Sequence, residues 1–179
     1  MPSLPTRDAM LRQWQAEDQH GLADLFADPG FSWHPYRRAR TPAEAAEFLL
    51  RVQRQWARRG IGVWAVTDRT GSELLGYCGV SEPDAGTWDA DWEIGLRLAA
   101  SVHGRGLGEQ VLVAALRDVF DRTDTDQVIA TIELGHTRSE RLFRRVGMQP
   151  AGQLPHPRFG TVHTVMRLTR QRWQQRAAP

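Results

Sequence analysis

The segment from His103 to Glu109 holds three glycines, Gly104, Gly106 and Gly108, at alternate positions. Glycine allows a backbone to approach a ligand closely, and the free N–H groups of a first helical turn favour an anion, above all a phosphate. The segment lacks the Gly-Lys-Ser/Thr of a P-loop, and its glycine spacing is not that of a dinucleotide fingerprint. The pattern indicates either a site for another phosphate-bearing ligand or a flexible connection between a strand and a helix.

A predicted strand precedes this glycine segment, and a predicted helix follows it. In the range 88–98 every second residue is apolar, and Asp89, Asp91, Glu93 and Arg97 lie between the apolar positions. That period is typical of a strand with one buried face. In the range 107–120 the apolar residues follow the i, i+3, i+4, i+7 spacing of a helix that lays one face against a sheet.

This order of strand, loop and helix resembles the acyl-coenzyme A signature of the GNAT superfamily of N-acetyltransferases, Gln/Arg-x-x-Gly-x-Gly/Ala. His103 stands at the first position, and Gly106 and Gly108 stand at the two glycines. The resemblance covers roughly residues 10–168.

Segment 136–148 resembles a second part of the superfamily pattern, Asn-x-x-Ser followed by a Leu-Lys-x-Gly-Phe segment. Ser139 and Gly147 match this pattern, whereas His136 and Met148 stand where the superfamily has Asn and Phe. The opening Trp-x-x-Glu-Asp, here residues 14–18, is similar to that of the branch that contains the ribosomal-protein N-terminal acetyltransferases.

The resemblance implies that acetyl-coenzyme A is the cosubstrate and lies beside the strand of residues 88–98. Its pantetheine arm would pair with backbone groups of Leu96, Arg97 and Leu98, between the splayed fourth and fifth strands of the superfamily fold. A backbone N–H near Leu98 would polarise the thioester carbonyl, and such a donor contributes on the order of a few kcal/mol. The pyrophosphate would rest on the N–H groups of Gly104, Arg105, Gly106, Leu107, Gly108 and Glu109. His103 could bond a phosphate oxygen or merely cap the loop, and His136 is a further candidate for contact with the coenzyme.

Direct transfer to an amine requires that the amine lose a proton, because the pKa of an α-amino group is about 8 and that of lysine about 10.4. A carboxylate can take this proton, often through a water molecule. Glu93, on the strand beside the expected thioester, is the first candidate, and Glu133, on the fifth strand, is the second. Each could instead be a solvent-facing strand residue.

The departing thiolate needs a proton or a hydrogen bond. Many superfamily members use a tyrosine on the helix after the fifth strand, but Phe143 stands at that position and cannot donate. Ser139 could serve instead, directly or through a water molecule, or it could be a hydroxyl on the helix surface. Six aromatic residues could line an acceptor pocket or belong to the core: Trp33, His34, Tyr36, Trp64, Trp88 and Trp92.

The predicted function is therefore transfer of acetyl from acetyl-coenzyme A to a primary amine, either a protein N-terminus or a small amine. A coenzyme A-binding regulatory module without catalysis is the alternative, and a sheet that binds no coenzyme is a third. Homodimers are common in the branch that the chain resembles, so a homodimer is possible.

The composition excludes several other classes. A chain of 179 residues with 41% hydrophobic content is long enough for one domain, which we place over residues 1–179 with a core at 10–168. All 23 basic residues are arginine and are scattered among 21 acidic residues, so we expect no nucleic-acid partner. No long apolar run or signal core is present, so we expect no membrane span and a cytoplasmic location. Cys78 is the single cysteine, and no histidine has partners at metal-ligand spacing, so we expect neither a disulfide nor a metal.

The remaining pattern predicts an α/β fold with the element order β-α-α-β-β-β-α-β-α-β. The resemblance implies a mixed, mainly antiparallel sheet with splayed fourth and fifth strands, flanked by about four helices. The segment around residues 31–40 is predicted as a loop, and residues 171–179 as a frayed polar tail. Strands are expected at 9–14, 61–67, 74–80, 88–98, 128–134 and 161–168, and helices at 17–27, 41–59, 107–120 and 137–146.

Overall fold

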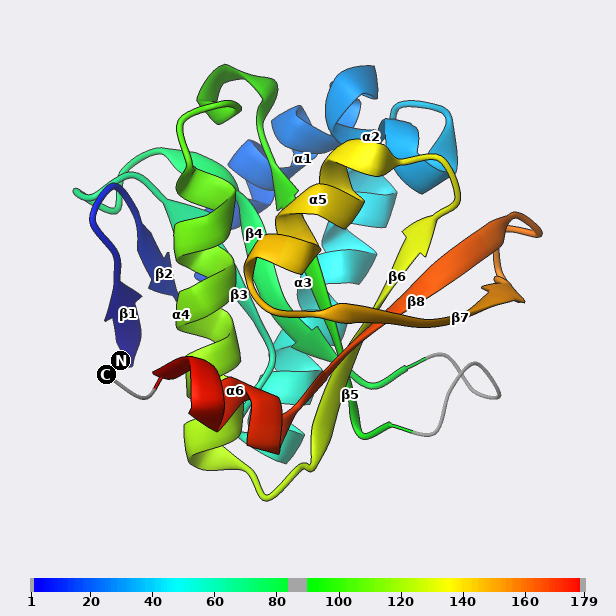
Figure 1. The fold of residues 1–179 in the computed structure, drawn as a ribbon. Coiled ribbons are helices and arrows are strands. Elements are labelled where there is room, and N and C mark those ends of the chain that lie inside the picture. Colours follow the sequence, from blue (N-terminus) through cyan, green and yellow to red (C-terminus); the bar gives the residue numbers. More distant parts are fainter. Residues whose placement is uncertain (1, 84–89, 178–179) are drawn as a thin grey trace.

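The computed structural model describes residues 2–83 and 90–177, and its strands form one eight-stranded sheet with helices on both faces (Figure 1). The strand order is β1-β2-β3-β4-β5-β6-β8-β7, and the described neighbours are antiparallel except for the parallel pair β5–β6. The predicted α/β class with a mainly antiparallel sheet is confirmed. The strands are β1 (Ser3–Pro5), β2 (Met10–Arg12), β3 (Val63–Thr67), β4 (Leu74–Ser81), β5 (Trp92–Leu98), β6 (Gln127–Glu133), β7 (Gln149–Pro155) and β8 (Val162–Thr169). The helices are α1 (Asp18–Ala27), α2 (Pro29–Tyr36), α3 (Pro42–Arg59), α4 (Leu107–Arg122), α5 (Thr137–Arg145) and α6 (Arg170–Ala177), with a 3-10 turn η1 (Ala100–Val102).

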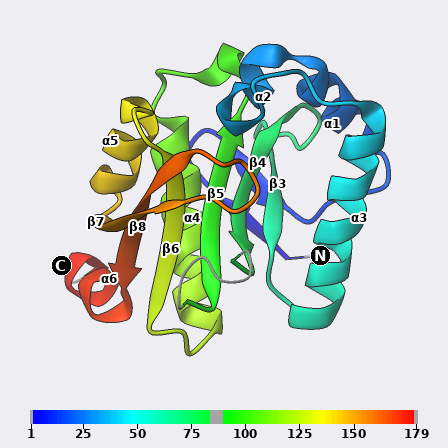
Figure 2. The same cartoon turned by 90° about the vertical axis from the view of Figure 1, so that its right-hand side faces the viewer.

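Two apolar clusters fill the two sides of the sheet. Helix α4 lies along one face with α5 and α6 beside it, and their side chains Leu112, Phe143 and Trp173 belong to one cluster. Helices α1, α2 and α3 cover the other face through a second cluster that includes Phe26 and Phe48. Figure 2 shows the sheet between α4 and α3. The side chains of β5 point alternately to these two faces, because successive side chains of a strand point to opposite sides of a sheet.

Strands β5 and β6 separate soon after they meet. Within the described residues their register comprises Trp92↔Val128 and Glu93↔Ile129, whereas β4 and β5 pair from Gly76↔Leu98 to Ser81↔Glu93. The predicted splay of these two strands is confirmed. We call the space beyond Glu93, between the diverging strands, the β5–β6 gap.

The backbone of β5 offers polar groups to this gap at alternate residues. The N–H of Ala99 donates to the carbonyl of Leu75 (2.8 Å), so this opposed pair is hydrogen-bonded. Because hydrogen-bonded pairs alternate along an antiparallel ladder, the polar backbone groups of Arg97 face β4. Those of Leu96 and Leu98 face the β5–β6 gap.

The segment after α1 differs from the predicted loop. Residues 29–36 form α2, which is interrupted at His34 by extended backbone (φ −98°, ψ 126°). Pro35 explains the interruption, because the residue before a proline is disfavoured in helical conformation. The short strand β1, which pairs with β2, was not predicted either.

Two further elements near the C-terminus correct the prediction. Strand β7 contains two prolines and a glycine, which argue against a strand, but it lies at the edge of the sheet, where proline is tolerated. The expected frayed tail forms α6 up to Ala177. Trp173 stacks on Phe120 (5.8 Å between ring centroids), and the Arg170 guanidinium donates to the carbonyls of Phe120, Thr123 and Thr125. These contacts order a segment that is polar by sequence.

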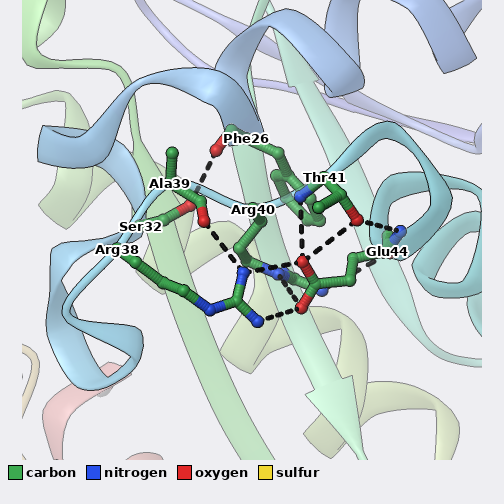
Figure 3. Close-up of polar contacts among 7 residues, drawn as sticks. All are labelled: Phe26, Ser32, Arg38, Ala39, Arg40, Thr41 and Glu44. Atoms are coloured by element: carbon green, nitrogen blue, oxygen red, sulfur yellow. Dashed lines mark hydrogen bonds and ion pairs between the residues drawn. The ribbon is translucent and has the colours of Figure 1, made fainter.

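The start of α3 was predicted correctly. Thr41 and Glu44 form a capping box, in which the Glu44 N–H donates to Thr41 Oγ1 (3.2 Å) and the Thr41 N–H donates to Glu44 (2.9 Å). Glu44 also binds Arg38, and Figure 3 shows this cluster with Arg40 beside Phe26. The predicted hairpin of β3 and β4 is confirmed as well. Trp88, Asp89 and the greater part of the predicted connection at 83–86 lie outside the described residues.

Candidate active site

The N-terminus of α4 opens beside the β5–β6 gap and presents unpaired backbone donors. Gly106 precedes the helix in left-handed conformation (φ 76°), and no described side chain caps the helix. The first helical bond runs from the N–H of Gln110 to the carbonyl of Gly106 (3.4 Å), so the N–H groups of residues 107–109 have no intrahelical acceptor. A Cβ at Gly104 or Gly106 would meet no described atom within 4 Å. An uncapped helix start with open backbone fits a pyrophosphate.

Gly108 has a different reason to be glycine. A Cβ there would lie 3.0 Å from Leu142 Cδ2 and 3.4 Å from Leu96 Cδ2. Gly108 therefore allows α4 to pack closely against α5 and β5. The side chain of Glu109 turns to Arg145 (3.2 Å), so its carboxylate is occupied by an ion pair at the helix surface.

The side chain of His103 ties the glycine loop to its neighbours. Its Nε2 lies 2.9 Å from the carbonyl of Leu98, and its Nδ1 lies 3.2 Å from Arg138 Nη1. Since a carbonyl only accepts and a guanidinium only donates, Nε2 carries the proton and Nδ1 accepts. The structure thus gives His103 the loop-capping contacts. Arg105 is exposed at the same loop, and Arg138 approaches it from α5.

The face of the sheet opposite α4 carries the two candidate carboxylates, at different heights along the β5–β6 gap. Glu93 lies at its closed end, where β5 still pairs with β6, and its carboxylate accepts a hydrogen bond from Thr131 Oγ1. Glu133 lies four residues farther along β6, at the open end. The two candidates therefore serve different parts of the gap.

Glu133 is nearly buried, with 8% of its surface exposed. Its Oε2 lies 2.7 Å from His34 Nδ1, and its Oε1 accepts a hydrogen bond from Arg37. Burial raises the pKa of Glu133, but the bond to His34 and the charge of Arg37 together lower it by more, so the pKa lies below its usual value. Glu133 is thus an ionised carboxylate engaged by His34 of α2 and by Arg37, which directly follows α2; we call residues 34–37 the tip of α2.

Two histidines meet above this carboxylate. The rings of His34 and His136 are stacked, with centroids 4.1 Å apart and planes at 16°. Burial, followed by the charge of His34, lowers the pKa of His136, which favours its neutral form. His136 Nε2 lies 3.4 Å from Ser139 Oγ, one turn into α5. The structure therefore brings together Glu133, His136 and Ser139 of the predicted site.

His34 and Arg37 are the residues whose part in this cluster the sequence did not reveal. His34 stood only among six aromatic candidates for an acceptor pocket, and its partner Glu133 is 99 positions away. No local spacing signals such a pair. Of the other aromatic candidates, Trp64 and Trp92 are core residues, with 1% and 4% exposed. Phe143 is buried as well, consistent with its lack of a polar group.

Residues 2–83 and 90–177 contain neither a metal-binding cluster nor a membrane-spanning helix. Within these ranges no three histidine, cysteine, aspartate or glutamate side chains are grouped so that they could hold a metal ion. None of the helices in the same ranges has both the length and the apolar character needed to cross a membrane.

Comparison with known proteins relates this geometry to a family. The family model described as "Acetyltransferase (GNAT) domain" matches residues 8–149. The protein YkkB of Bacillus subtilis (strain 168) is 27% identical over 146 residues, which cover 81% of this chain and 84% of that protein.

Solved structures share the fold. The ribosomal-protein-S5-alanine acetyltransferase of Vibrio fischeri is similar with a TM-score of 0.78 at 15% identity, over 97% of this chain and 99% of the other. The aminoglycoside acetyltransferase AAC(6')-Ib in complex with coenzyme A is similar with a TM-score of 0.78 at 19% identity, over 95% and 99%. With the family model over most of its length, the chain belongs to the GNAT acetyltransferase family and is an acetyl-coenzyme A-dependent N-acetyltransferase.

Proposed function

We propose that this enzyme acetylates a primary amine, either the α-amine of a protein N-terminus or a small amine, in one direct step. The observation that supports this proposal is the β5–β6 gap, which opens beside an uncapped helix start on one side and a pair of carboxylates on the other. A donor held in the gap would present its acetyl group on the face of the sheet that carries Glu93 and Glu133. We also propose that the enzyme belongs to the branch of the family that includes the ribosomal-protein acetyltransferases.

The chain's own groups suit the coenzyme. Backbone groups of Leu96 and the N–H of Leu98 face the gap, where they can pair with the amides of a pantetheine arm. The free N–H groups at the start of α4, with Arg105 and Arg138 nearby, can hold the phosphates. Acetyl-coenzyme A supplies an activated acetyl group as a thioester, and the N–H of Leu98 would polarise its carbonyl.

The leaving thiolate requires a donor near α5. Ser139 is the hydroxyl that we propose for this role, since Phe143 is apolar and buried. His136 lies 3.4 Å from the Ser139 oxygen and can orient the hydroxyl. No covalent enzyme intermediate is required, and the buried thiol of Cys78, whose pKa burial raises, is unsuited to form one.

The relatives do not choose between acceptor classes. One similar structure is of an enzyme named for alanine of a ribosomal protein and another of an enzyme named for aminoglycosides, both at the same TM-score. We therefore propose both classes and test them together.

The test joins a titration calorimetry measurement with acetyl-coenzyme A to an assay of thiol release in the same sample. The acceptors are N-terminal peptides, with the same peptides blocked at the α-amine as controls, and a set of small amines. Binding followed by release with an unblocked peptide or a small amine supports the proposal and identifies the class. Binding without release on any acceptor would favour a regulatory module.

A further inference from the structure

We propose that His34 is the base that takes the proton of the acceptor amine, and that Glu133 positions its ring. This inference rests on the proposed function and assigns a residue within the same site. It gives the two carboxylates different roles, because Glu133 then acts through His34, whereas Glu93 is not the base.

The contacts of the ring fix which nitrogen is basic. The Glu133 carboxylate, 2.7 Å from Nδ1, is ionised and can only accept, so the proton of the neutral ring sits on Nδ1. The lone pair is then on Nε2. The side chain is 34% exposed, and Nε2 has no hydrogen-bond partner among the described residues. A carboxylate that orients an imidazole whose other nitrogen is open is the arrangement of a general base.

The position of the ring agrees with this role. Arg97 donates a hydrogen bond to the carbonyl of His34, while Glu133 holds its ring, so the tip of α2 spans the open end of the β5–β6 gap. Arg97 directly precedes Leu98, whose N–H is the proposed donor to the thioester carbonyl. Glu93 lies four residues before Arg97 on β5, roughly 13 Å away at the usual rise per residue. Its carboxylate accepts a hydrogen bond from Thr131.

The surrounding scaffold holds this tip in place. The Arg40 guanidinium lies over the Phe26 ring (3.7 Å) and the Tyr36 ring (4.5 Å). The backbone N–H of Arg40 donates to the backbone carbonyl of Phe26 (2.7 Å). Ser32 also bonds the Phe26 carbonyl, as Figure 3 shows. The residues on both sides of His34 are thereby fixed to α1, which reduces the freedom of the ring.

Charged and titratable groups face the ring from each packed element. They are Glu133 of β6, Arg37 directly after α2, Arg97 of β5 and His136 before α5, with His163 of β8 in register with Glu133. Variants at these positions would alter the pH profile and are avoided as controls.

The proton balance is simple. An ammonium acceptor gives one proton to His34 Nε2, and the imidazolium is stabilised by the Glu133 carboxylate and later releases this proton to water. The nitrogen lone pair forms the C–N bond as the C–S bond breaks. The second proton leaves the nitrogen and ends on the sulfur, so the products are the amide, the free thiol and one released proton.

The test compares His34→Asn with Glu93→Gln. The amide nitrogen of asparagine can replace Nδ1 as donor to Glu133, but the variant has no base at Nε2. We expect kcat/KM to fall about 100-fold or more, the acidic limb of its pH profile to vanish, and the Kd of acetyl-coenzyme A to stay the same. Glu93→Gln should keep this limb of the pH profile, even if the variant changes the maximum value of kcat/KM. The control is His20→Asn, at an exposed histidine of α1.

Two additional measurements complete the test. Imidazole in solution should restore part of the rate of His34→Ala, which a merely structural loss would not allow. Nitrogen-15 NMR of the ring should show the proton on Nδ1 in the wild type and a loss of this preference in Glu133→Gln. Retention of the pH limb in His34→Asn, or a resting ring with its proton on Nε2, would overturn the inference. The NMR result needs no turnover, so it decides even where no amine yields thiol release, an outcome that contradicts the proposed function itself.

Discussion

Replacement of Gly106 by tryptophan separates ligand binding from folding at the start of α4. Gly106 has a φ of 76°, and an L-residue in left-handed conformation costs about 1–2 kcal/mol. A Cβ there meets no described atom within 4 Å, so the Cβ itself adds no steric overlap to this strain. For a chain of this size, about 2–4 °C of Tm is lost per kcal/mol. The variant should therefore fold, with a Tm lowered by roughly 2–8 °C.

The effect on acetyl-coenzyme A should be much larger. An indole at residue 106 would cover N–H groups of residues 107–109 that have no intrahelical acceptor. A hydrogen bond to a charged group contributes about 1.5–3 kcal/mol, so losing one such bond to phosphate raises Kd about 10- to 150-fold. Loss of two such bonds would raise Kd by the product of two such factors.

The control is Gly71→Trp, in the turn between β3 and β4. Gly71 has a φ of 82°, and its Cβ would also meet no described atom within 4 Å. Both variants should lose similar Tm in a thermal melt, but calorimetry should show weaker coenzyme binding only for Gly106→Trp. Equal Kd values for the two variants would refute the placement of the pyrophosphate.

Three other substitutions test separate parts of the structure. Ser139→Ala removes one hydrogen bond to the thiolate and should lower kcat about 10- to 150-fold in the thiol-release assay with an unchanged coenzyme Kd, and an unchanged kcat would make the serine a surface hydroxyl. Glu44→Gln should lower Tm at neutral pH, because the hydrogen bond from Arg38, followed by that from the Thr41 N–H, lowers the pKa of Glu44 from its ordinary 4.5 to about 2. A lowered carboxyl pKa stabilises the fold above pH 4.5 and ceases to do so as the pH falls toward 2, so wild-type and variant melts should converge there. Trp173→Ala should cost about 3 kcal/mol in urea unfolding, whereas a loss below about 1 kcal/mol would mean that α6 contributes little.

The elements predicted correctly are those whose signal is local. The alternation in β5, the helical period of α4 and the capping box at Thr41 each lie within a few turns of chain, and the structure reproduces them. The glycine loop is likewise a short motif.

The elements and contacts that were not predicted depend on residues that are distant in sequence. Strand β7 forms despite Pro150 and Gly152 because β8 supplies a partner along one edge. Helix α6 is polar in sequence, and the ring of Phe120, more than fifty residues earlier, stabilises it through Trp173. The pairing of His34 with Glu133 is of the same kind, since the two residues are 99 positions apart and no local pattern links them. A local motif can therefore predict a coenzyme loop, but it cannot predict contacts between residues that are distant in sequence.

The tip of α2 links the shape of the gap to its chemistry. Strand β5 is fixed by β4 and strand β6 by β8, so beyond Glu93 the two strands have no backbone ladder in common within the described residues. Their side chains are instead joined by the α2 tip, because Arg97 binds the His34 backbone while Glu133 binds the His34 ring and Arg37. The residue proposed as base thus also bridges the two walls of the gap. A change in α2 that moves this tip would alter the width of the gap and the position of the proposed base together, so our proposals predict that donor binding and proton transfer are coupled through one short segment.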